Sequence, residues 1–201
     1  MHADGWTGVF WDMDEFPLPP GLDVNQFVKN VKLAISSEGF RGPEVDFFAY
    51  TSSDSFNYRD NEFFTLFKVE DKRSGFYRLL HGMLNWLYKR QQYGGTKSLL
   101  FIAKAMPGED NDTMISFLNQ LFDRGHCILT VVPDGCSPEN FDYPEPTLAW
   151  YWSDLCSGNK SIELPDPTFS DDDSGSSSPE TDGADQGVER ARETDVAHSR
   201  N

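Results

Sequence analysis

The sequence predicts an α/β fold in which helices cover both sides of a mostly parallel sheet. Short apolar runs, typical of buried strands, alternate along the chain with longer stretches in which apolar residues recur every three or four positions, as in amphipathic helices. A strand, a helix and a second strand in succession almost always cross over right-handed and pair in parallel. Aromatic residues make up 14% of the 201 residues, so the chain has enough large apolar side chains for one packed core.

The first strand is predicted at residues 7–12, and acidic residues follow at its end. Its apolar run leads directly into Asp12, Asp14 and Glu15 before a proline-rich turn. Ligands of open parallel sheets bind beyond the carboxyl ends of the strands, and a buried carboxylate is costly unless it has a partner. Asp12 and Asp14 point to opposite faces of an extended chain. We therefore expect a site here that holds at most two of the three carboxylates.

The next elements complete a strand-helix-strand unit. Asp23 and Gln26 have the spacing of a capping box, which predicts a helix from residue 24, and Gly39 ends it. Apolar residues recur at helical spacing along this segment, so one face of the helix is expected to be buried. The aromatic run at 45–51 predicts the second strand, and the run at 63–69 predicts another.

The clearest helix lies in the middle of the chain. Its apolar residues have helical spacing and predict one inward face made of Phe76, Leu79, Leu80, Met83, Leu84, Leu87 and Tyr88. Gly94 and Gly95 end this segment, because glycine favours the backbone conformation in which helices stop. The apolar run at 98–103 then predicts a strand.

The last third of the domain continues the alternation of helix and strand. An acidic loop is predicted at 108–112, a helix at 113–124 and a strand at 127–132. The run at 148–152 fits either a final strand or a helical turn, and its pattern does not decide between them.

Residues 1–160 are predicted to form one domain and residues 161–201 a disordered tail. The tail is rich in Ser and Asp and has almost nothing to bury, so burial cannot offset the entropy of folding. The formal net charge of −16 argues against a protein that coats nucleic acid by charge alone. Any contact with RNA is therefore expected to be local, and the acidic tail is a candidate surface for protein partners.

The cysteines and the N-terminal residues indicate the cellular compartment in which the protein is expected. The three cysteines lack the spacing of a zinc site or a disulfide framework, which indicates a reducing, intracellular environment such as the cytoplasm or the nucleus. The first residues do not form a signal peptide, and no apolar run is long enough for a membrane span. We expect a soluble protein without a membrane partner.

Lys72, Arg73 and Arg78 are the candidate RNA-contacting residues. They lie in a basic stretch of an otherwise acidic chain and are interleaved with Phe76 and Tyr77. Proteins that bind single strands combine cations and aromatic rings in this way. The other interpretation is the solvated polar side of an amphipathic helix, and from the sequence alone we favour that simpler interpretation.

Several stretches carry a family resemblance. The opening motif Val9-Phe10-Trp11-Asp12-Met13-Asp14-Glu15-Phe16-Pro17-Leu18-Pro19, together with residues 39–43, 49–50, 124–129 and 150–155, resembles the NYN domain, in the plant group similar to the meiosis regulator and mRNA stability factor. The resemblance implies a PIN-like, three-layer Rossmann-type fold and a role in RNA metabolism and the regulation of gene expression. In active members it implies hydrolysis of single-stranded RNA with Mg²⁺ or Mn²⁺ held by clustered acids, here Asp12 and Asp14. The family also admits a peroxisomal location.

The sequence departs from that family at most of its acidic positions. Glu15 stands where the motif has Asn, Thr51 and Ser52 replace a Gly-Asp pair, and Lys104 lies where an acid follows the strand at 98–103. Asp110 and Asp112 lie in an insertion and are candidate replacements for the lost carboxylates. Mg²⁺ needs hard oxygen ligands, and a lysine at position 104 puts a positive charge where the cation belongs. We therefore expect a weak or absent nuclease that keeps the fold for binding RNA or protein.

A haloacid-dehalogenase-like phosphatase is the other enzyme class that the opening motif resembles. In that class the first Asp attacks phosphate and the second acts as acid and base, roles that Asp12 and Asp14 match, and Thr51 matches the second motif. The acidic motif that closes a later strand in that class is missing here. This alternative therefore ranks below the NYN interpretation.

Overall fold

The computed structural model describes residues 5–54, 64–104, 108–138 and 146–163. They lie in one compact unit, Met1–Pro165, built around a six-stranded sheet of order β3-β2-β1-β4-β5-β6. Every pair of neighbouring strands is parallel, which confirms the predicted α/β class. The greater part of the predicted tail lies outside the described residues; within them, Ile162 forms a bridge to Ala149.

The strands and helices follow the predicted order along the chain. The strands are β1 (Trp6–Asp12), β2 (Val45–Thr51), β3 (Thr65–Lys68), β4 (Lys97–Ile102), β5 (Cys127–Val132) and β6 (Leu148–Tyr151). The helices are α1 (Val24–Ser37), α2 (Lys72–Arg90), α3 (Glu109–Asp123) and α4 (Trp152–Ser157), with a short 3₁₀ turn η1 (Gln91–Tyr93) after α2. The segment that fitted either a strand or a helical turn contains both, since β6 passes directly into α4.

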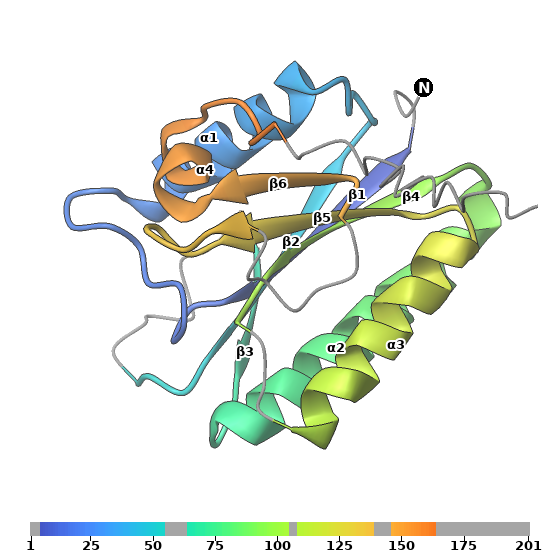
Figure 1. Ribbon diagram of the computed structural model, residues 1–201, viewed down its shortest axis with the longest axis horizontal. Helices are drawn as coiled ribbons and strands as arrows, with labels where there is room; N and C mark the ends of the chain where they lie inside the picture. The colour runs from blue at the N-terminus through green and yellow to red at the C-terminus, as the bar shows by residue number, and fades with distance from the viewer. Residues whose placement is uncertain (1–4, 55–63, 105–107, 139–145, 164–201) are drawn as a thin grey trace, which may run out of the picture. The chain divides into compact units, whose positions relative to one another are not determined.

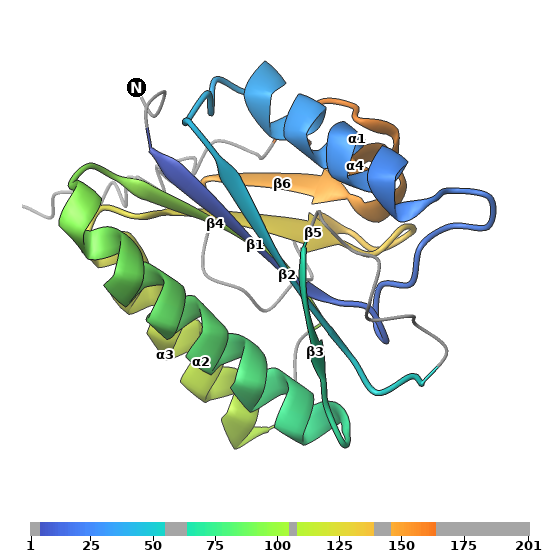
Figure 2. The same cartoon turned by 180° about the vertical axis from the view of Figure 1, so that it is seen from behind.

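Two helical layers enclose the sheet. Helices α1 and α4 cover one face, and α2 and α3 cover the other (Figures 1 and 2). The alternation of side chains along β1 supplies both cores: Val9 and Trp11 pack on the α1 side, whereas Phe10 packs on the α2 side. The central strand is therefore apolar on both faces, as expected for a parallel sheet buried between helices.

The inward face of α2 differs from the predicted one. Leu84 and Tyr88 are 49% and 77% exposed, and Trp86 is buried in their place. The Trp86 indole N–H donates a hydrogen bond of 2.7 Å to Asp46 Oδ2, so its polar edge is satisfied inside the fold. Periodicity alone predicted too wide an apolar face, because it counted every large residue at helical spacing as inward.

Helix α3 begins earlier than predicted. The segment at 108–112, expected to be a loop, contains the first turn of the helix, with Glu109, Asp110 and Asp112 in it. Carboxylates are favourable at this position because the N-terminal end of a helix carries a partial positive charge. The acidic run therefore starts the helix.

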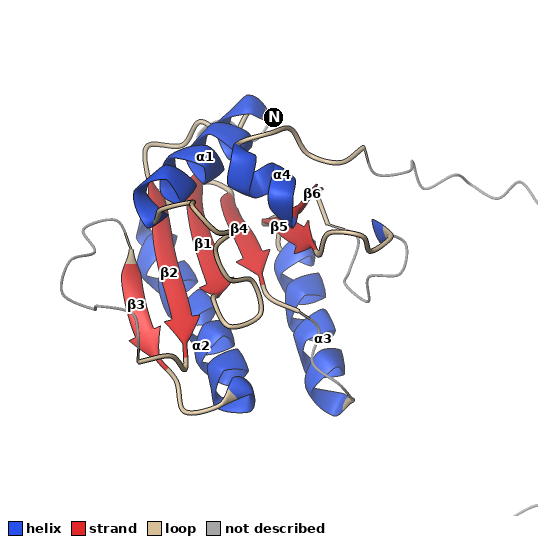
Figure 3. Cartoon of the chain, turned by 90° about the vertical axis from the view of Figure 1, so that its left-hand side faces the viewer, coloured by secondary structure: helices blue, strands red, loops and turns tan. Residues whose placement is uncertain are grey.

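The carboxyl ends of the strands lie at one edge of the sheet. The strands point the same way, so the loops after β1, β2 and β4 gather there (Figure 3). The chain leaves β1 toward α1 on one face, whereas the helix that follows β4, α3, lies on the opposite face. Adjacent parallel strands whose connections run to opposite faces leave a crevice at their carboxyl ends, where ligands of such sheets bind.

Candidate functional site

A tight turn after β1 places the acidic residues at this edge. The Phe16 amide donates to the Asp12 carbonyl at 3.0 Å, and the Met13 amide donates to the Tyr50 carbonyl at 2.9 Å. The Trp11 indole N–H also donates to the Phe16 carbonyl at 2.8 Å. These bonds fold the acidic segment back against the ends of β1 and β2.

All three acids line one small cavity of about 40 Å³, together with Tyr50 and Lys72. The alternation of an extended strand predicted that at most two would share a site. That expectation is wrong because β1 ends at Asp12 and the tight turn that follows gathers Asp14 and Glu15 on the same side.

Asp12 is the most buried of the three acids. Its Oδ1 accepts hydrogen bonds from the amides of Asp14 at 3.0 Å and Glu15 at 3.2 Å. Burial raises the pKa of Asp12; the two amides oppose this shift, and the nearby carboxylates of Asp14 and Glu15 add to it. Among the described residues, no hydrogen bond engages the other oxygen, Oδ2, so Asp12 is the acid with an open ligand position.

Both oxygens of Asp14 are engaged by the end of β2. The Thr51 hydroxyl donates to Oδ1 at 2.6 Å, and the Ser52 amide donates to Oδ2 at 2.7 Å. Burial raises the pKa of Asp14, but these hydrogen bonds to the charged form outweigh it and lower the pKa. Thr51 and Ser52 thus hold Asp14 in a fixed orientation.

Glu15 lies between two lysines from different elements. Lys72 Nζ, at the start of α2, lies 2.5 Å from Oε1, and Lys104 Nζ, after β4, lies 3.2 Å from Oε2. Burial raises the pKa of Glu15, but the two lysines outweigh burial and lower the pKa. The side chain of Glu15 is only 19% exposed, so the lysine ammonium groups neutralise a largely buried charge.

This arrangement does not fit a divalent metal centre. The oxygens of Asp14 and Glu15 are occupied by internal donors, and Asp12 alone offers a free oxygen. Across the part of the chain that the structure describes, no group of three or more His, Cys, Asp or Glu side chains could hold a metal ion. Mg²⁺ binds through one or two carboxylates and keeps much of its water shell, and two ammonium groups beside those carboxylates oppose it electrostatically.

Asp110 and Asp112 lie on α3. Asp110 accepts a 2.5 Å hydrogen bond from the Tyr77 hydroxyl and forms an ion pair with Arg73, whose Nε lies 3.0 Å from Oδ2. Asp112 is exposed in the first turn of α3. The structure therefore joins Asp110 to α2, and neither residue forms a described contact with Asp12.

The candidate RNA-contacting residues differ in what surrounds them. Lys72 and Arg73 are engaged by Glu15 and Asp110. The Arg78 guanidinium instead lies 5.8 Å from the centre of the Phe67 ring. Of these three cations, Arg78 is the one without a carboxylate partner among the described residues.

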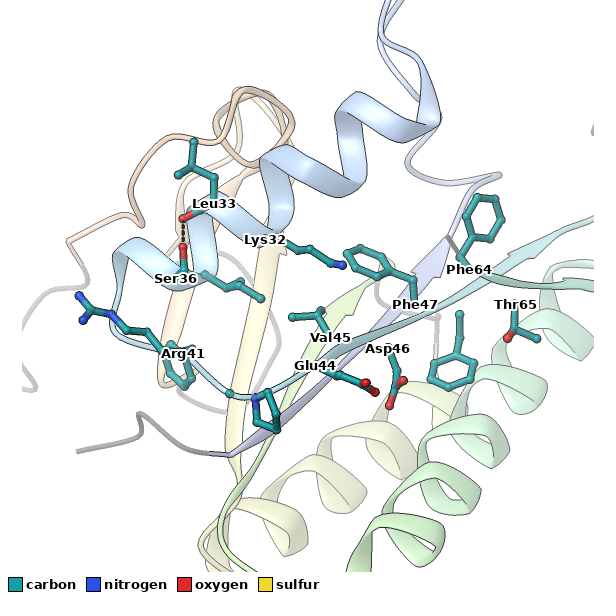
Figure 4. Close-up of a pocket in the computed structure, with 15 residues that line it drawn as sticks. Lys32, Leu33, Ser36, Arg41, Glu44, Val45, Asp46, Phe47, Phe64 and Thr65 are labelled. Carbon is teal, nitrogen blue, oxygen red and sulfur yellow. Dashed lines mark hydrogen bonds between the residues drawn. The ribbon is translucent and has the colours of Figure 1, made fainter. Parts of the chain in front are cut away.

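The largest cavity described lies on the opposite, α1 side of the sheet, and sequence patterns gave no indication of it. It has a volume of about 900 Å³ and is open to solvent between α1 and the start of β2. Figure 4 shows Lys32 pointing toward Phe47, and its ammonium lies 5.9 Å from the ring centre. The wall of this cavity combines charged with apolar side chains, and one of its acids, Asp46, is paired with Arg90.

Comparison with protein-family models and with curated proteins finds no match to the chain. No helix in the described part of the chain is long and apolar enough to cross a membrane.

Proposed function

We propose that this protein is an NYN-type protein of RNA metabolism that binds single-stranded RNA and does not cleave it, and that it acts in this way in the regulation of gene expression. The observation that carries the loss of cleavage is the contact of Glu15 with both Lys72 and Lys104. These two lysines supply the positive charge that Mg²⁺ or Mn²⁺ supplies in the active enzymes that the sequence resembles.

The loss of cleavage follows from the chemistry of phosphodiester hydrolysis. A metal-dependent nuclease needs the metal to polarise the phosphate and to produce hydroxide from bound water. A lysine ammonium attracts phosphate, but it has no open coordination position and does not lower the pKa of a water molecule as a metal does. Both ammonium groups are already paired with Glu15, and without a metal the site lacks the source of the nucleophile.

Binding of RNA is supported by the surface that α2 presents. Among the described residues, most of the large apolar or aromatic side chains that are substantially exposed lie on α2 or in η1, namely Tyr77, Leu84, Tyr88 and Tyr93. Aromatic rings beside cations are the usual means of holding a single strand, because every base has a face that can stack. An acidic protein can bind RNA in this way only over a small area.

A cleavage assay on the full chain tests the proposal. We expect a labelled, unstructured RNA to shift in fluorescence anisotropy equally in EDTA and in millimolar Mg²⁺ or Mn²⁺, and to stay intact in all three conditions. Asp12→Asn, which removes the one acid with a free oxygen, is the matched variant and should bind RNA as the natural chain does. Metal-dependent cleavage that Asp12→Asn abolishes would overturn the proposal.

A phosphatase of the haloacid-dehalogenase type is the second candidate, and one contact favours it. The Thr51 hydroxyl lies 2.6 Å from Asp14 Oδ1, which brings together two side chains that the motifs of that class pair. Release of phosphate from a chromogenic ester in Mg²⁺, lost in Asp12→Asn, would favour this candidate. Lys104 at the end of β4, where that class has acids, argues against it.

A further inference from the structure

A groove runs along α2 on the side that faces the edge of the sheet. It has a volume of about 290 Å³. Phe48, Tyr50 and Phe67 of β2 and β3 line it from the sheet, and Arg78, Asn85 and Lys89 line it from the helix. Figure 2 shows the arrangement of α2 beside the short edge strand β3. The groove is distinct from the cavity that the three acids line, although the Tyr50 ring borders both.

Aromatic rings form the floor of this groove. The ring of Phe67 stacks on that of Tyr50 at 5.1 Å between centres and 15° between planes, and Phe48 stacks on Phe10 at 5.1 Å and 13°. Phe48 and Phe67 remain partly exposed, because β3 has only four residues and is the edge strand of the sheet that the described residues form. The floor therefore offers flat apolar surface to a ligand at the edge of the sheet.

The helical wall of the groove carries positive charge without a matching acid. Arg78 and Lys89 are exposed, and neither has a carboxylate partner among the described residues. Lys72, Arg73 and Arg90 of the same helix all form ion pairs. In a chain of net charge −16, two cations that line an aromatic groove without an acidic partner among the described residues give local complementarity to an anion.

The spacing of the two cations indicates an extended ligand. Arg78 and Lys89 are eleven positions apart on one side of α2, about 16 Å along the axis at 1.5 Å per residue. Positions this far apart along a helix suit an extended ligand with several negative charges better than a single phosphate. A chain with repeated phosphates, whose bases reach the aromatic floor, can contact both.

We propose that the groove between α2 and the β2–β3 edge binds a segment of single-stranded RNA. Arg78 and Lys89 contact two of its phosphates, and the Phe48 and Phe67 rings contact bases between them. His81 and Asn85, joined by a 3.2 Å hydrogen bond on the same wall, offer polar atoms to base edges. This inference rests on the proposed function, since it names the surface through which RNA is bound.

A charge-matched pair of variants tests the groove. Full-length Arg78→Ala/Lys89→Ala is compared with Lys29→Ala/Lys32→Ala, which removes the same charge from exposed positions of α1 on the other face. Binding of an unstructured twelve-nucleotide RNA is followed by fluorescence anisotropy in EDTA at several salt concentrations. We expect the groove variant to weaken binding at least tenfold and the control to change it less than twofold.

The salt dependence gives a second readout. Each phosphate contact on a single strand contributes about 0.7 to the slope of log affinity against log salt, so loss of two contacts should reduce the slope by about 1.4. Both substitutions are at exposed positions, and thermal unfolding of the variants should match that of the natural chain. An unchanged slope together with unchanged affinity would overturn the assignment of the groove.

The outcomes separate this inference from the proposed function. If the natural chain does not bind RNA, the proposed function fails. If it binds RNA and the groove variant binds equally well, the inference fails while the proposed function stands. Displacement of the RNA by equimolar mononucleotide would overturn the extended ligand in favour of a single-nucleotide site. Equal displacement by an acidic peptide would show that charge alone is recognised and would overturn the role of the rings.

Discussion

Helix α2 carries positive charges of two kinds, those paired with acids and those without an acidic partner among the described residues. At its start, Lys72 and Arg73 contact Glu15 and Asp110 and so connect the helix to the loop after β1 and to α3. Further along, Arg78 and Lys89 face the groove at the sheet edge with no acid beside them among the described residues. The first pair contributes to the fold, and the second pair is available to a ligand.

This difference shows that residue type does not define an interface. All four residues look alike in the sequence, as cations on the polar side of one helix. What separates them is whether another element brings a carboxylate within contact distance. Cations held in internal ion pairs and cations open to a ligand can therefore lie on the same helix.

The largest expected effect is the gain of a metal site by Lys104→Asp. The change removes one of the cations on Glu15 and adds a carboxylate two residues after Ile102, which pairs with Trp11 just before Asp12. We expect calorimetry to detect Mn²⁺ binding with a dissociation constant on the order of 1 mM, about 4 kcal/mol, where the natural chain shows none. Lys104→Met, which removes the charge without adding a ligand, is the control. Equal binding by both variants would mean that position 104 supplies no ligand.

A second effect concerns the contact of α2 with the sheet. A methyl group at Gly82 would overlap the Tyr50 hydroxyl, which is buried without a described hydrogen-bond partner. Gly82→Ala should lower the free energy of unfolding by about 2 kcal/mol, because overpacking outweighs the better helix propensity of alanine. Denaturant unfolding measures this loss.

The same change in a Tyr50→Phe background is the matched control. Phenylalanine lacks the hydroxyl, so the main overlap disappears and most of the lost stability should return. A loss of equal size in both backgrounds would place the strain elsewhere than at Tyr50. Tyr50→Phe by itself should stabilise the protein by about 1 kcal/mol, since it removes a buried hydroxyl that lacks a partner.

A smaller effect is expected at the acid that the two lysines contact. Glu15→Gln should lower the free energy of unfolding by about 1 kcal/mol at pH 7, because both lysines are roughly half exposed and solvent screens their attraction. The pKa of Glu15 is lowered in the folded state, so its contribution is present above the ordinary glutamate pKa of about 4.3. It is lost as the pH falls through the folded pKa. Unfolding curves between pH 7 and pH 3 should converge for the two proteins, and a constant difference would contradict this assignment.

The smallest expected effect is a slight increase in the free energy of unfolding when Asp12 is replaced by Asn. Burial raises the pKa of Asp12 in the folded state, so ionisation of this group above the ordinary aspartate pKa of about 3.9 costs stability. Asp12→Asn should therefore stabilise the protein slightly at pH 7, and the gain should vanish at acidic pH. Thermal unfolding of the two proteins at both pH values measures the difference. A destabilised variant at pH 7 would mean that the charge of Asp12 is favourably held.

The sequence determined most of the fold because the spacing of its apolar residues indicates which faces of the strands and helices are buried. The run before Asp12 is apolar on both faces, as only a central parallel strand requires, and the first helix begins at its predicted cap, where the Asp23 side chain accepts from the Gln26 amide at 2.8 Å. The same patterns indicated that acidic residues end β1. These are local properties, fixed by residues that are near one another in the chain.

The state of the candidate site was decided by tertiary contacts. Glu15 meets Lys72 and Lys104, which lie far along the chain, and no spacing rule connects these residues. The sequence did indicate that Lys104 brings positive charge to a family metal position, but it did not indicate that Lys72 joins it on Glu15. The groove at the sheet edge was equally hidden, because it depends on how closely Gly82 lets α2 approach Tyr50. Local patterns set which residues are buried or charged, whereas only the assembled sheet and helices decide which charges meet a partner.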